Sequence, residues 1–432
     1  MDELRIDGQA LLERMRELPG GQQVFDLAAG RGDVELVGGA VRDLLLERTP
    51  RELDVVVAGD APSFARELAL RLGIPAAADP EGGSGVAAHE RFGTAVVWWP
   101  GGRVDIAARR AESYSSPGAL PDVRAGTIEE DLRRRDFTVN AIAVFIAGPR
   151  MGEFSAVAHA FEDLDRSLLR VLHERSFVDD PTRLLRLARY LARLGFEPAE
   201  HTAELAAQAL ASDQLATVSG ARIGTELRLL LSEPDPLAAL GWLSRLGVLE
   251  ALRPGLALQE QVVRRALAAL PPDGRSDLLL LASLLLGLSH DPAADPERAM
   301  LELLDDLEFA AGDRDRAIGA ALKARVLLDR LEAARTPSEL GEPVHAAPVE
   351  ALALALGLAE EQGRTRAAAA AARWISELRH VRLQITGEDL LAAGVPAGPE
   401  IGRRLKLAMR RKLDGELPGG REAELSAAME AL

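Results

Sequence analysis

The first third of the chain alternates short β-branched runs with turn residues. Apolar runs of about four to eight residues bounded by Gly, Pro, Asn or Asp are typical of strands, whereas apolar residues three and four apart are typical of helices. These patterns predict helices at residues 41–47 and 61–72. They predict strands at residues 35–37, 53–57, 85–99 and 103–107. Two apolar runs flank Pro100, Gly101 and Gly102, which indicates a hairpin.

Beyond residue 166 the strand pattern largely disappears. Leu, Ala, Arg and Glu dominate, apolar residues recur at helical spacing, and Pro or Gly separates the segments. We therefore expect an α+β fold, in which an N-terminal head with a small mixed β-sheet and flanking helices precedes an all-helical neck, body and tail. The expected parts are a head at residues 1–150, a neck at 151–235, a body at 236–372 and a tail at 373–432.

Composition and charge narrow the classes of protein. The chain has 432 residues, with 67 Asp and Glu against 51 Lys and Arg, a net charge of −16. This balance argues against non-specific wrapping of nucleic acid but allows a local basic groove. The absence of cysteine excludes a disulfide scaffold, a zinc–thiolate site and thiol catalysis. With only 10 Phe, 4 Trp and 2 Tyr, base recognition is expected to use hydrogen bonds with Arg and Asp side chains rather than aromatic stacking.

No segment has the pattern of a membrane anchor. The first twenty residues carry charges throughout and contain no apolar signal-peptide core. The most apolar stretch, residues 278–288, is too short to span a bilayer. We expect a cytoplasmic protein with no membrane partner, and the sequence leaves its oligomeric state open.

The segment LVGGAVRD, followed by ELDVVV, carries the first candidate chemistry. Gly38 and Gly39 lie between a predicted strand and helix, where backbone N–H groups and the helix start favour phosphate. Arg42 lies one helical turn further and can reach the same anion. Glu52 and Asp54 alternate along a strand, so both carboxylates point to one face. Paired carboxylates beside a phosphate-binding turn suit Mg²⁺ and phosphoryl transfer.

The ordinary alternatives stay open for these residues taken singly. A Gly-Gly pair after a strand is usually a turn, and an acidic pair on a surface strand is usually solvated. The dinucleotide fingerprint G-x-G-x-x-G and the P-loop pattern are both absent, which removes the two commonest families of phosphate loop. The combination at this spacing is more specific than its parts.

Two later segments are rich in arginine. DLRRRDFTVNA places Arg134, Arg135, Asp136 and Asn140 near the start of an apolar strand or helix. In DDPTRLLRLAR, four polar residues recur at intervals of three along one predicted helix. They are Asp180, Arg183, Arg186 and Arg189. An Asp acceptor beside an Arg donor can pair with a base edge. The alternative interpretation is a solvated, ion-paired helix face.

In this order, the motifs resemble the class II tRNA nucleotidyltransferase and bacterial poly(A) polymerase family, whose commonest members are CCA-adding enzymes. The resemblance covers residues 35–226 and resumes in the tail. Its motifs are GGAVRDLLL, ELDVVV, RFGTA, VDIAARRAESYSSPGALPDV, DLRRRDFTVNAIA, DDPTRLLRLARYLARLGF, SGARIGTEL, ITGEDLLAAGVPAGPEIGRRL and LDGEL.

The resemblance implies roles for individual residues. Gly39 and Arg42 would hold the triphosphate, with Gly38 in the same turn. Glu52 and Asp54 would bind the catalytic metals, and Asp105 would help activate the primer hydroxyl. Contacts to the ribose and phosphates would come from Arg134, Arg135, Asp136 and Asn140. Asp180 and Arg183 would pair with the base of CTP or ATP, supported by Arg186 and Arg189. Residues 112–127 match the segment that such enzymes use when they change from adding C to adding A.

The chain departs from the family at the metal pair. Family members have Asp-x-Asp, whereas this chain has Glu52-Leu53-Asp54. The extra methylene moves the carboxylate by about one C–C bond, and Mg²⁺ requires near-octahedral geometry, so the change bears on the rate. Asp179 stands where Glu is commoner, which is a milder change.

The resulting prediction is a template-independent nucleotidyltransferase that adds CMP and AMP to the 3′ end of tRNA, with Mg²⁺ as cofactor and CTP and ATP as substrates. A poly(A) polymerase, or an enzyme limited to CC or A addition, would use the same chemistry. A non-catalytic RNA-binding relative is the alternative that Glu52 suggests. A phosphohydrolase built on His290 and Asp291 would release phosphate in a metal-dependent reaction that survives Asp54→Ala.

The tail contains a basic run in an otherwise acidic chain. Residues 403–412 carry six positive charges and no negative ones. These residues are Arg403, Arg404, Lys406, Arg410, Arg411 and Lys412. The run can be a solvated helix face, but we favour contact with RNA phosphates, which would fix the tRNA by shape and charge.

Overall fold

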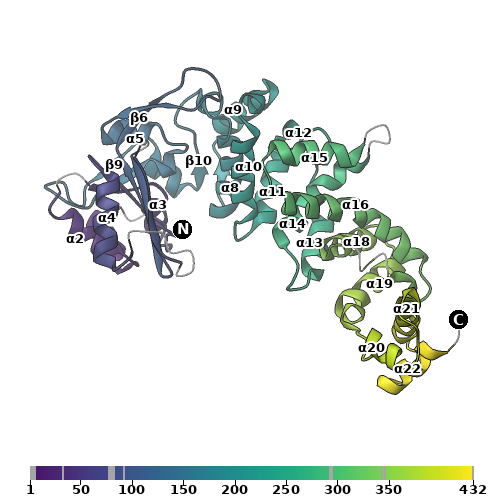
Figure 1. Cartoon of the computed structure of the whole chain (residues 1–432). Coiled ribbons are helices and arrows are strands. Elements are labelled where there is room, and N and C mark those ends of the chain that lie inside the picture. Colours follow the sequence, from purple (N-terminus) through teal and green to yellow (C-terminus); the bar gives the residue numbers. More distant parts are fainter. Residues whose placement is uncertain are drawn as a thin grey trace. The chain divides into compact units, whose positions relative to one another are not determined.

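A computed structural model describes residues 6–31, 34–75, 83–90, 93–290, 295–341, 344 and 347–430. The chain divides into two compact units, residues 1–218 and 219–432. In Figure 1 the strands of the seven-stranded sheet are purple to blue, and the helices of the second unit run from teal through green to yellow. The α+β class expected from the sequence is confirmed. The four-part division into head, neck, body and tail stays a prediction.

The first unit is organised around one mixed sheet of seven strands, in the order β3-β4-β5-β2-β1-β8-β9. Only the pair β2 and β5 is parallel; the other neighbours are antiparallel. The sheet strands are β1 (Val34–Val37), β2 (Leu53–Val57), β3 (Gly85–His89), β4 (Thr94–Trp99), β5 (Gly102–Ala108), β8 (Ile142–Phe145) and β9 (Phe154–Ala156). Two small pairs lie outside it, β6 (Arg110–Ser113) with β7 (Asp122–Ala125) and β10 (Leu168–Leu169) with β11 (Glu197–Pro198).

The helices of the first unit flank this sheet and continue beyond it. They are α1 (Gly8–Glu17), α2 (Gly21–Ala28), α3 (Gly38–Leu45), α4 (Ala61–Leu72), α5 (Ile128–Arg133), α6 (Ala160–Asp165), α7 (Ser176–Asp179), α8 (Arg183–Leu194) and α9 (Glu200–Ala211). The 3₁₀ turns η2 (Thr138–Asn140) and η3 (Gln214–Thr217) also lie in the described part of this unit. Helix α5 packs Ile128 and Leu132 against buried sheet residues such as Val56 and Ala143, which fixes the segment that follows it.

The predicted elements are largely confirmed, with two corrections. Strand β2 and helix α4 have the expected bounds, and β4 and β5 form the expected hairpin with Trp99 opposite Gly102. The run at residues 85–99 is two antiparallel strands, β3 and β4, rather than one. Helix α3 begins at Gly38, not at residue 41, so both glycines lie inside its first turn.

The second unit is helical throughout its described residues. Its helices are α10 (Gly220–Leu231), α11 (Pro236–Arg245), α12 (Val248–Leu252), α13 (Glu260–Ala269), α14 (Ser276–Leu285), α15 (Pro296–Asp306), α16 (Ala311–Ala333), α18 (Val349–Glu361), α19 (Thr365–Ser376), α20 (Gly387–Ala392), α21 (Pro399–Leu413) and α22 (Arg421–Met429). Three 3₁₀ turns lie between them, η4 (Leu286–His290), η5 (Pro337–Leu340) and η6 (Leu378–His380).

Apolar helices form the centre of the second unit. Helix α18 is buried along residues 350–359, and α14 along residues 278–285, as expected for helices that are apolar on every face. The buried carboxylate of Glu350 accepts hydrogen bonds from Arg316 and from the backbone N–H of Arg275, so its charge is compensated. Within the described residues, no helix has the length and apolar composition needed to cross a bilayer.

Candidate active site

Three carboxylates meet on one side of the sheet in the first unit. Strands β2 and β5 run parallel with Asp54 opposite Asp105, so both side chains leave the same face. Glu52 directly precedes β2, and one oxygen from each of the three residues lies within 4.8 Å of the others. We call Glu52, Asp54 and Asp105 the acidic cluster. The expectation that Glu52 and Asp54 share one face agrees with this arrangement.

The charge in the acidic cluster favours a cation. Burial raises the pKa of Asp54 to about 7, and the nearby negative charge of Glu52 adds to this effect. Asp105 accepts two hydrogen bonds from Arg103, at 2.8 and 2.9 Å, and the same guanidinium lies 3.5 Å from Glu52. Oxygen ligands of this kind are those that Mg²⁺ and similar hard cations prefer. The cluster therefore fits a divalent metal.

Arg103 was not among the residues predicted from the sequence. It lies two residues before Asp105 on β5, and residues two apart on a strand face the same side. That spacing was a usable signal. The hydrogen bond to Asp105 raises the pKa of Arg103, so the guanidinium stays protonated beside the acidic cluster.

The predicted Gly-Gly turn lies beside the acidic cluster. Gly38 has a φ of +65°, and a Cβ at this position would lie 2.6 Å from Nη1 of Arg135. A Cβ at Gly39 would lie 3.6 Å from Oδ2 of Asp54. Any side chain at Gly38 would both strain the backbone and displace Arg135. The turn therefore keeps space open next to the carboxylates.

Arg42 is buried rather than directed into open space. Only 1% of its surface is exposed. Its guanidinium donates to Oδ1 of Asn140 and to Oδ1 of Asp43. These contacts join α3 to the turn that contains Asn140, so two segments predicted separately to bind the nucleotide meet in the structure.

Within the segment Arg134 to Asp136, the side chains of Arg134 and Arg135 contact different parts of the site. Arg135 lies near Gly38 and lowers the pKa of Asp54, against the effect of burial. Arg134 donates instead to Glu112, at 2.9 Å. Both arginines are held by the fully buried carboxylate of Asp131, Arg134 at 2.7 Å and Arg135 at 3.0 Å.

Asp131 and Glu112 were not singled out from the sequence. Asp131 lies in DLRRRD, where its spacing of three and four from the two arginines was the available signal. Glu112 lies on β6, and no local pattern shows that it faces α5. Its pairing depends on the tertiary fold.

Asp136 connects this segment to helix α8. Its carboxylate accepts from Asn140 Nδ2 at 3.0 Å and from Arg186 Nε at 2.9 Å. Burial opposes ionisation, but Arg186 and Asn140 hold the pKa of Asp136 well below its ordinary value. Asp136 is therefore ionised and acts as the acceptor at the centre of this network.

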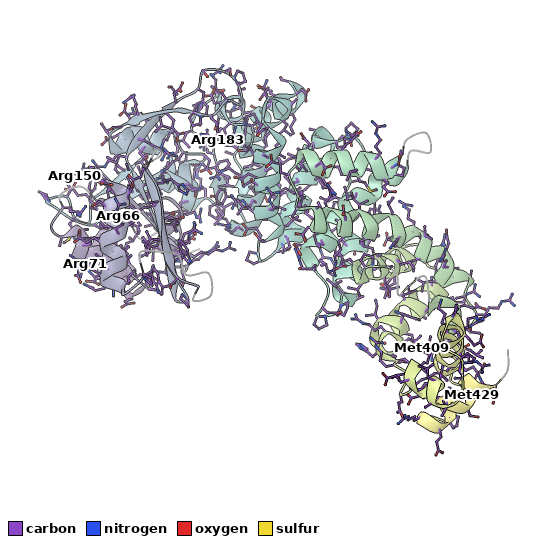
Figure 2. All side chains as sticks on the ribbon, viewed as in Figure 1. Arg66, Arg71, Arg150, Arg183, Met409 and Met429 are labelled. Atoms are coloured by element: carbon purple, nitrogen blue, oxygen red, sulfur yellow. The ribbon has the colours of Figure 1, made fainter. Side chains whose placement is uncertain are left out.

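The predicted polar stripe on α8 is not a solvated face. Arg183 and Arg189 have exposed fractions of only 4% and 6%. Arg183 donates to the backbone carbonyl of Arg134 at 2.8 Å and to Oγ of Ser176 at 2.6 Å; Figure 2 labels its side chain. Asp180 precedes the helix and accepts from the N–H and the hydroxyl of Thr182. The stripe therefore packs on the segment that contains Arg134 and Asp136.

A cavity of about 370 Å³ opens beside these residues. Its walls include Glu112, Tyr114, Arg134, Asp179 and Arg183. Burial and the nearby charge of Glu112 raise the pKa of Tyr114 to about 12, so its hydroxyl stays protonated. The cavity offers both hydrogen-bond donors and acceptors, as a site for a nucleotide base requires.

Most of the basic run in the tail pairs within the tail. Arg403 and Arg404 contact Glu400 at 2.7 and 2.8 Å, and Arg411 and Lys412 pair with Glu430 and Glu424. Lys406 also has an interaction partner, and Arg410 is exposed. Intramolecular ion pairs thus account for much of the charge that the sequence presents as a continuous basic face. RNA binding by these six residues stays a prediction.

The phosphohydrolase alternative rests on His290 and Asp291. Asp291 and the side chain of His290 lie outside the described residues. The acidic cluster contains neither residue.

Comparison with known proteins identifies the family. The family description "Poly A polymerase head domain" matches residues 34–170, and "Probable RNA and SrmB-binding site of polymerase A" matches residues 195–259. The CC-adding tRNA nucleotidyltransferase of Deinococcus radiodurans is 35% identical over 375 residues, covering 86% of this chain and 83% of that protein. The chain belongs to the class II tRNA nucleotidyltransferase and poly(A) polymerase family.

Members with different products are similar to this chain. The A-adding tRNA nucleotidyltransferase of Geobacter sulfurreducens is 31% identical over 425 residues, which cover 94% of this chain and 46% of that protein. The chain thus spans about half the length of this relative. The structure of the Thermotoga maritima CCA-adding enzyme complexed with tRNA aligns over all of both chains, with a TM-score of 0.75 and 26% identity. A CCA-adding enzyme with ATP aligns equally fully, with a TM-score of 0.78.

Proposed function

We propose that this chain adds CMP and AMP, from CTP and ATP, to the 3′ end of tRNA. The observation that carries this proposal is the acidic cluster beside the Gly38–Gly39 turn. The similar proteins are named as tRNA nucleotidyltransferases or CCA-adding enzymes, and the acidic cluster lies within residues 34–170, which match the poly(A) polymerase head domain. Three carboxylates that share one face and a turn that excludes side chains are what two metal ions and a triphosphate need.

The reaction forms one P–O bond and breaks another. The 3′ hydroxyl oxygen of the RNA attacks the α-phosphorus, and the bond to the β-phosphate oxygen breaks as pyrophosphate leaves. Mg²⁺ bound by Glu52 and Asp54 would polarise the phosphate and neutralise developing charge. Asp105 accepts the hydroxyl proton. Arg135 orients the phosphates from the side of the glycine turn, which the buried guanidinium of Arg42 supports next to Gly39.

Base selection is assigned to the region of α8. Asp180 and Arg183 would pair with the base edge, since Arg donates and Asp accepts. Arg183 reaches the cavity that Arg134 and Asp179 also line, which supports this assignment. Arg186 and Arg189 hold the helix against the segment that binds the ribose and phosphates.

Extension of tRNA tests the proposal directly. We expect a tRNA that lacks its 3′ CCA to gain two C residues with CTP alone, and then one A when ATP is added. Each nucleotide is supplied separately and together, and the products are sequenced. Arrest after CC would assign a CC-adding enzyme, and extension only of a tRNA that already ends in CC would assign an A-adding enzyme. Polymerisation of ATP on unrelated RNA would contradict the proposal.

Glu52 provides a second test, because family members have Asp at this position. We expect Glu52→Asp to raise the incorporation rate about three- to tenfold, since the shorter side chain restores the usual distance from strand to metal. The rate is measured in single turnover with saturating CTP. Glu52→Gln serves as the matched variant and should lower the rate.

The same pair of variants separates the enzyme from a non-catalytic relative. If neither the natural protein nor Glu52→Asp incorporates nucleotide while both still bind tRNA, the chain is an RNA-binding relative and not an enzyme.

A further inference from the structure

Tyr190 lies at the centre of four arginines in the first unit. It is one of only two tyrosines in the chain. The guanidinium carbons of Arg42, Arg186, Arg189 and Arg193 lie 5.5, 5.7, 5.1 and 5.5 Å from the centroid of its ring. Each distance falls within the range of about 6 Å over which a cation and an aromatic ring attract. No other ring in the described residues has four such contacts.

The four arginines come from two elements. Arg186, Arg189 and Arg193 precede or follow Tyr190 on α8, and Arg42 reaches the ring from α3. Phe137 supports the ring from a third direction, edge to face, with centroids 5.8 Å apart. The ring is therefore fixed by packing before any ligand binds.

The four arginines around Tyr190 repel one another, and nearby acidic groups offset part of this repulsion. Asp136 pairs with Arg186, and Asp43 pairs with Arg42. Arg189 and Arg193 have further partners of their own. The negative faces of the tyrosine ring add an uncharged source of attraction that all four cations share. Unlike a carboxylate, a ring does not compete with phosphate for the same hydrogen-bond donors.

We propose that Tyr190 is a positioning residue, which holds the guanidinium group of Arg42 beside the glycine turn that receives the phosphates, and holds Arg186 and Arg189 against the segment that binds the ribose and phosphates. This inference rests on the proposed function, in which these three arginines contact or support the nucleotide. Tyr190 acts through the arginines and does not touch the reacting atoms. Its contribution is independent of the base, because phosphate is common to every nucleotide.

Binding measurements without RNA test the role of Tyr190. CTP, ATP and inorganic pyrophosphate are titrated into the full-length protein in the presence of Mg²⁺, and heat is measured. We expect Tyr190→Leu to weaken binding of all three by about tenfold, with similar factors. Tyr190→Phe keeps the ring and should bind each within about twofold of the natural protein. The matched control is Phe154→Leu, which removes another edge-to-face pair of the same unit, with Phe161, and should leave binding unchanged.

Steady-state kinetics add a readout that general loss of stability does not give. For Tyr190→Leu we expect a higher KM for CTP and for ATP, with kcat changed less than about threefold. If Tyr190→Leu does not fold, Tyr190→Met provides the same comparison.

Three results would overturn the inference. They are unchanged pyrophosphate binding in Tyr190→Leu, a loss confined to one base, or equal losses in Tyr190→Phe and Tyr190→Leu. A protein that binds nucleotides in this pattern but adds none to tRNA would contradict the proposed function while leaving the inference intact.

Discussion

Asp54→Asn should lower nucleotide incorporation at least about 1,000-fold while leaving tRNA affinity unchanged. Asp54 is the central member of the acidic cluster, opposite Asp105 on the parallel strand and close to the glycine turn. The amide keeps the shape of the Asp54 side chain but removes the negative charge that holds a divalent cation. Without the cation, the negative charge that develops on the phosphate in the transition state is not neutralised. The measurement is single-turnover addition of CMP to a tRNA without its 3′ CCA.

The same variant should be more stable than the natural protein when metal is absent. The pKa of Asp54 is raised from its ordinary value of 3.8 to about 7 in the folded protein. Between these two pH values the folded state keeps a proton that the unfolded state has released. Stability therefore falls as pH rises from about 4 to 7, and an uncharged amide escapes this loss. Because the carboxyl is only partly buried, solvent screens its charge and reduces the effect. We expect Asp54→Asn to raise the free energy of unfolding by about 1–2 kcal/mol at pH 8. Thermal unfolding in EDTA measures this difference, and the midpoint of Asp54→Asn should be about 2–4 °C higher than that of the natural protein.

The control for both effects is Glu17→Gln, an exposed acid of α1. It should change neither incorporation nor the unfolding midpoint. Added Mg²⁺ should stabilise the natural protein and not Asp54→Asn. Incorporation by Asp54→Asn within tenfold of the natural rate would contradict the assignment of Asp54.

Asp136→Ala should destabilise the first unit by about 3–5 kcal/mol, the usual effect of removing one partner from a buried ion pair. Arg186, Asn140 and the backbone N–H of Phe137 would all lose their acceptor. Because these groups position the nucleotide-binding arginines, KM for CTP and ATP should rise at least about tenfold. Thermal unfolding and initial-rate kinetics give the two values.

A double-mutant cycle separates the pair from its surroundings. Asp136→Ala and Arg186→Ala should be non-additive, because each removes the same interaction. Asp122→Ala, on the exposed strand β7, is the control and should have little effect. Additive effects of the two substitutions would contradict a direct role for the pair. Since the pKa of Asp136 is held below its ordinary value, its stabilising contribution is present above that value and is lost only as the solution becomes more acidic.

Local signals predicted the elements that carry the acidic cluster. The β-branched run of residues 53–57 is bounded by turn residues, and α4 begins where the Asp60 side chain accepts from the N–H of Ser63 with Pro62 in the first turn. The alternation of Glu52 and Asp54 was enough to place both on one face. Their proximity to Asp105 required the parallel pairing of β2 with β5, and the resemblance to a known family, not the spacing, supplied that residue.

The remaining features depend on contacts between distant segments. The α8 stripe has the spacing of a solvated face, and only the fold shows that Arg183 and Arg186 reach Arg134 and Asp136. The buried pair of Glu35 with Arg109 joins residues 74 apart in sequence and has no local signature. In the tail the acids that pair with the basic run lie outside it, so a charge count within residues 403–412 leaves these ion pairs out.

In the proposed reaction the acidic cluster binds a divalent cation beside the nucleotide. Mn²⁺ in place of Mg²⁺, with CTP bound, tests this most directly, because anomalous X-ray scattering from a crystal locates the metal without reference to activity. We expect Mn²⁺ to be coordinated by Asp54 and Glu52 next to the phosphates, and to be lost in Asp54→Asn. Mn²⁺ bound elsewhere, or retained at the cluster without Asp54, would contradict it.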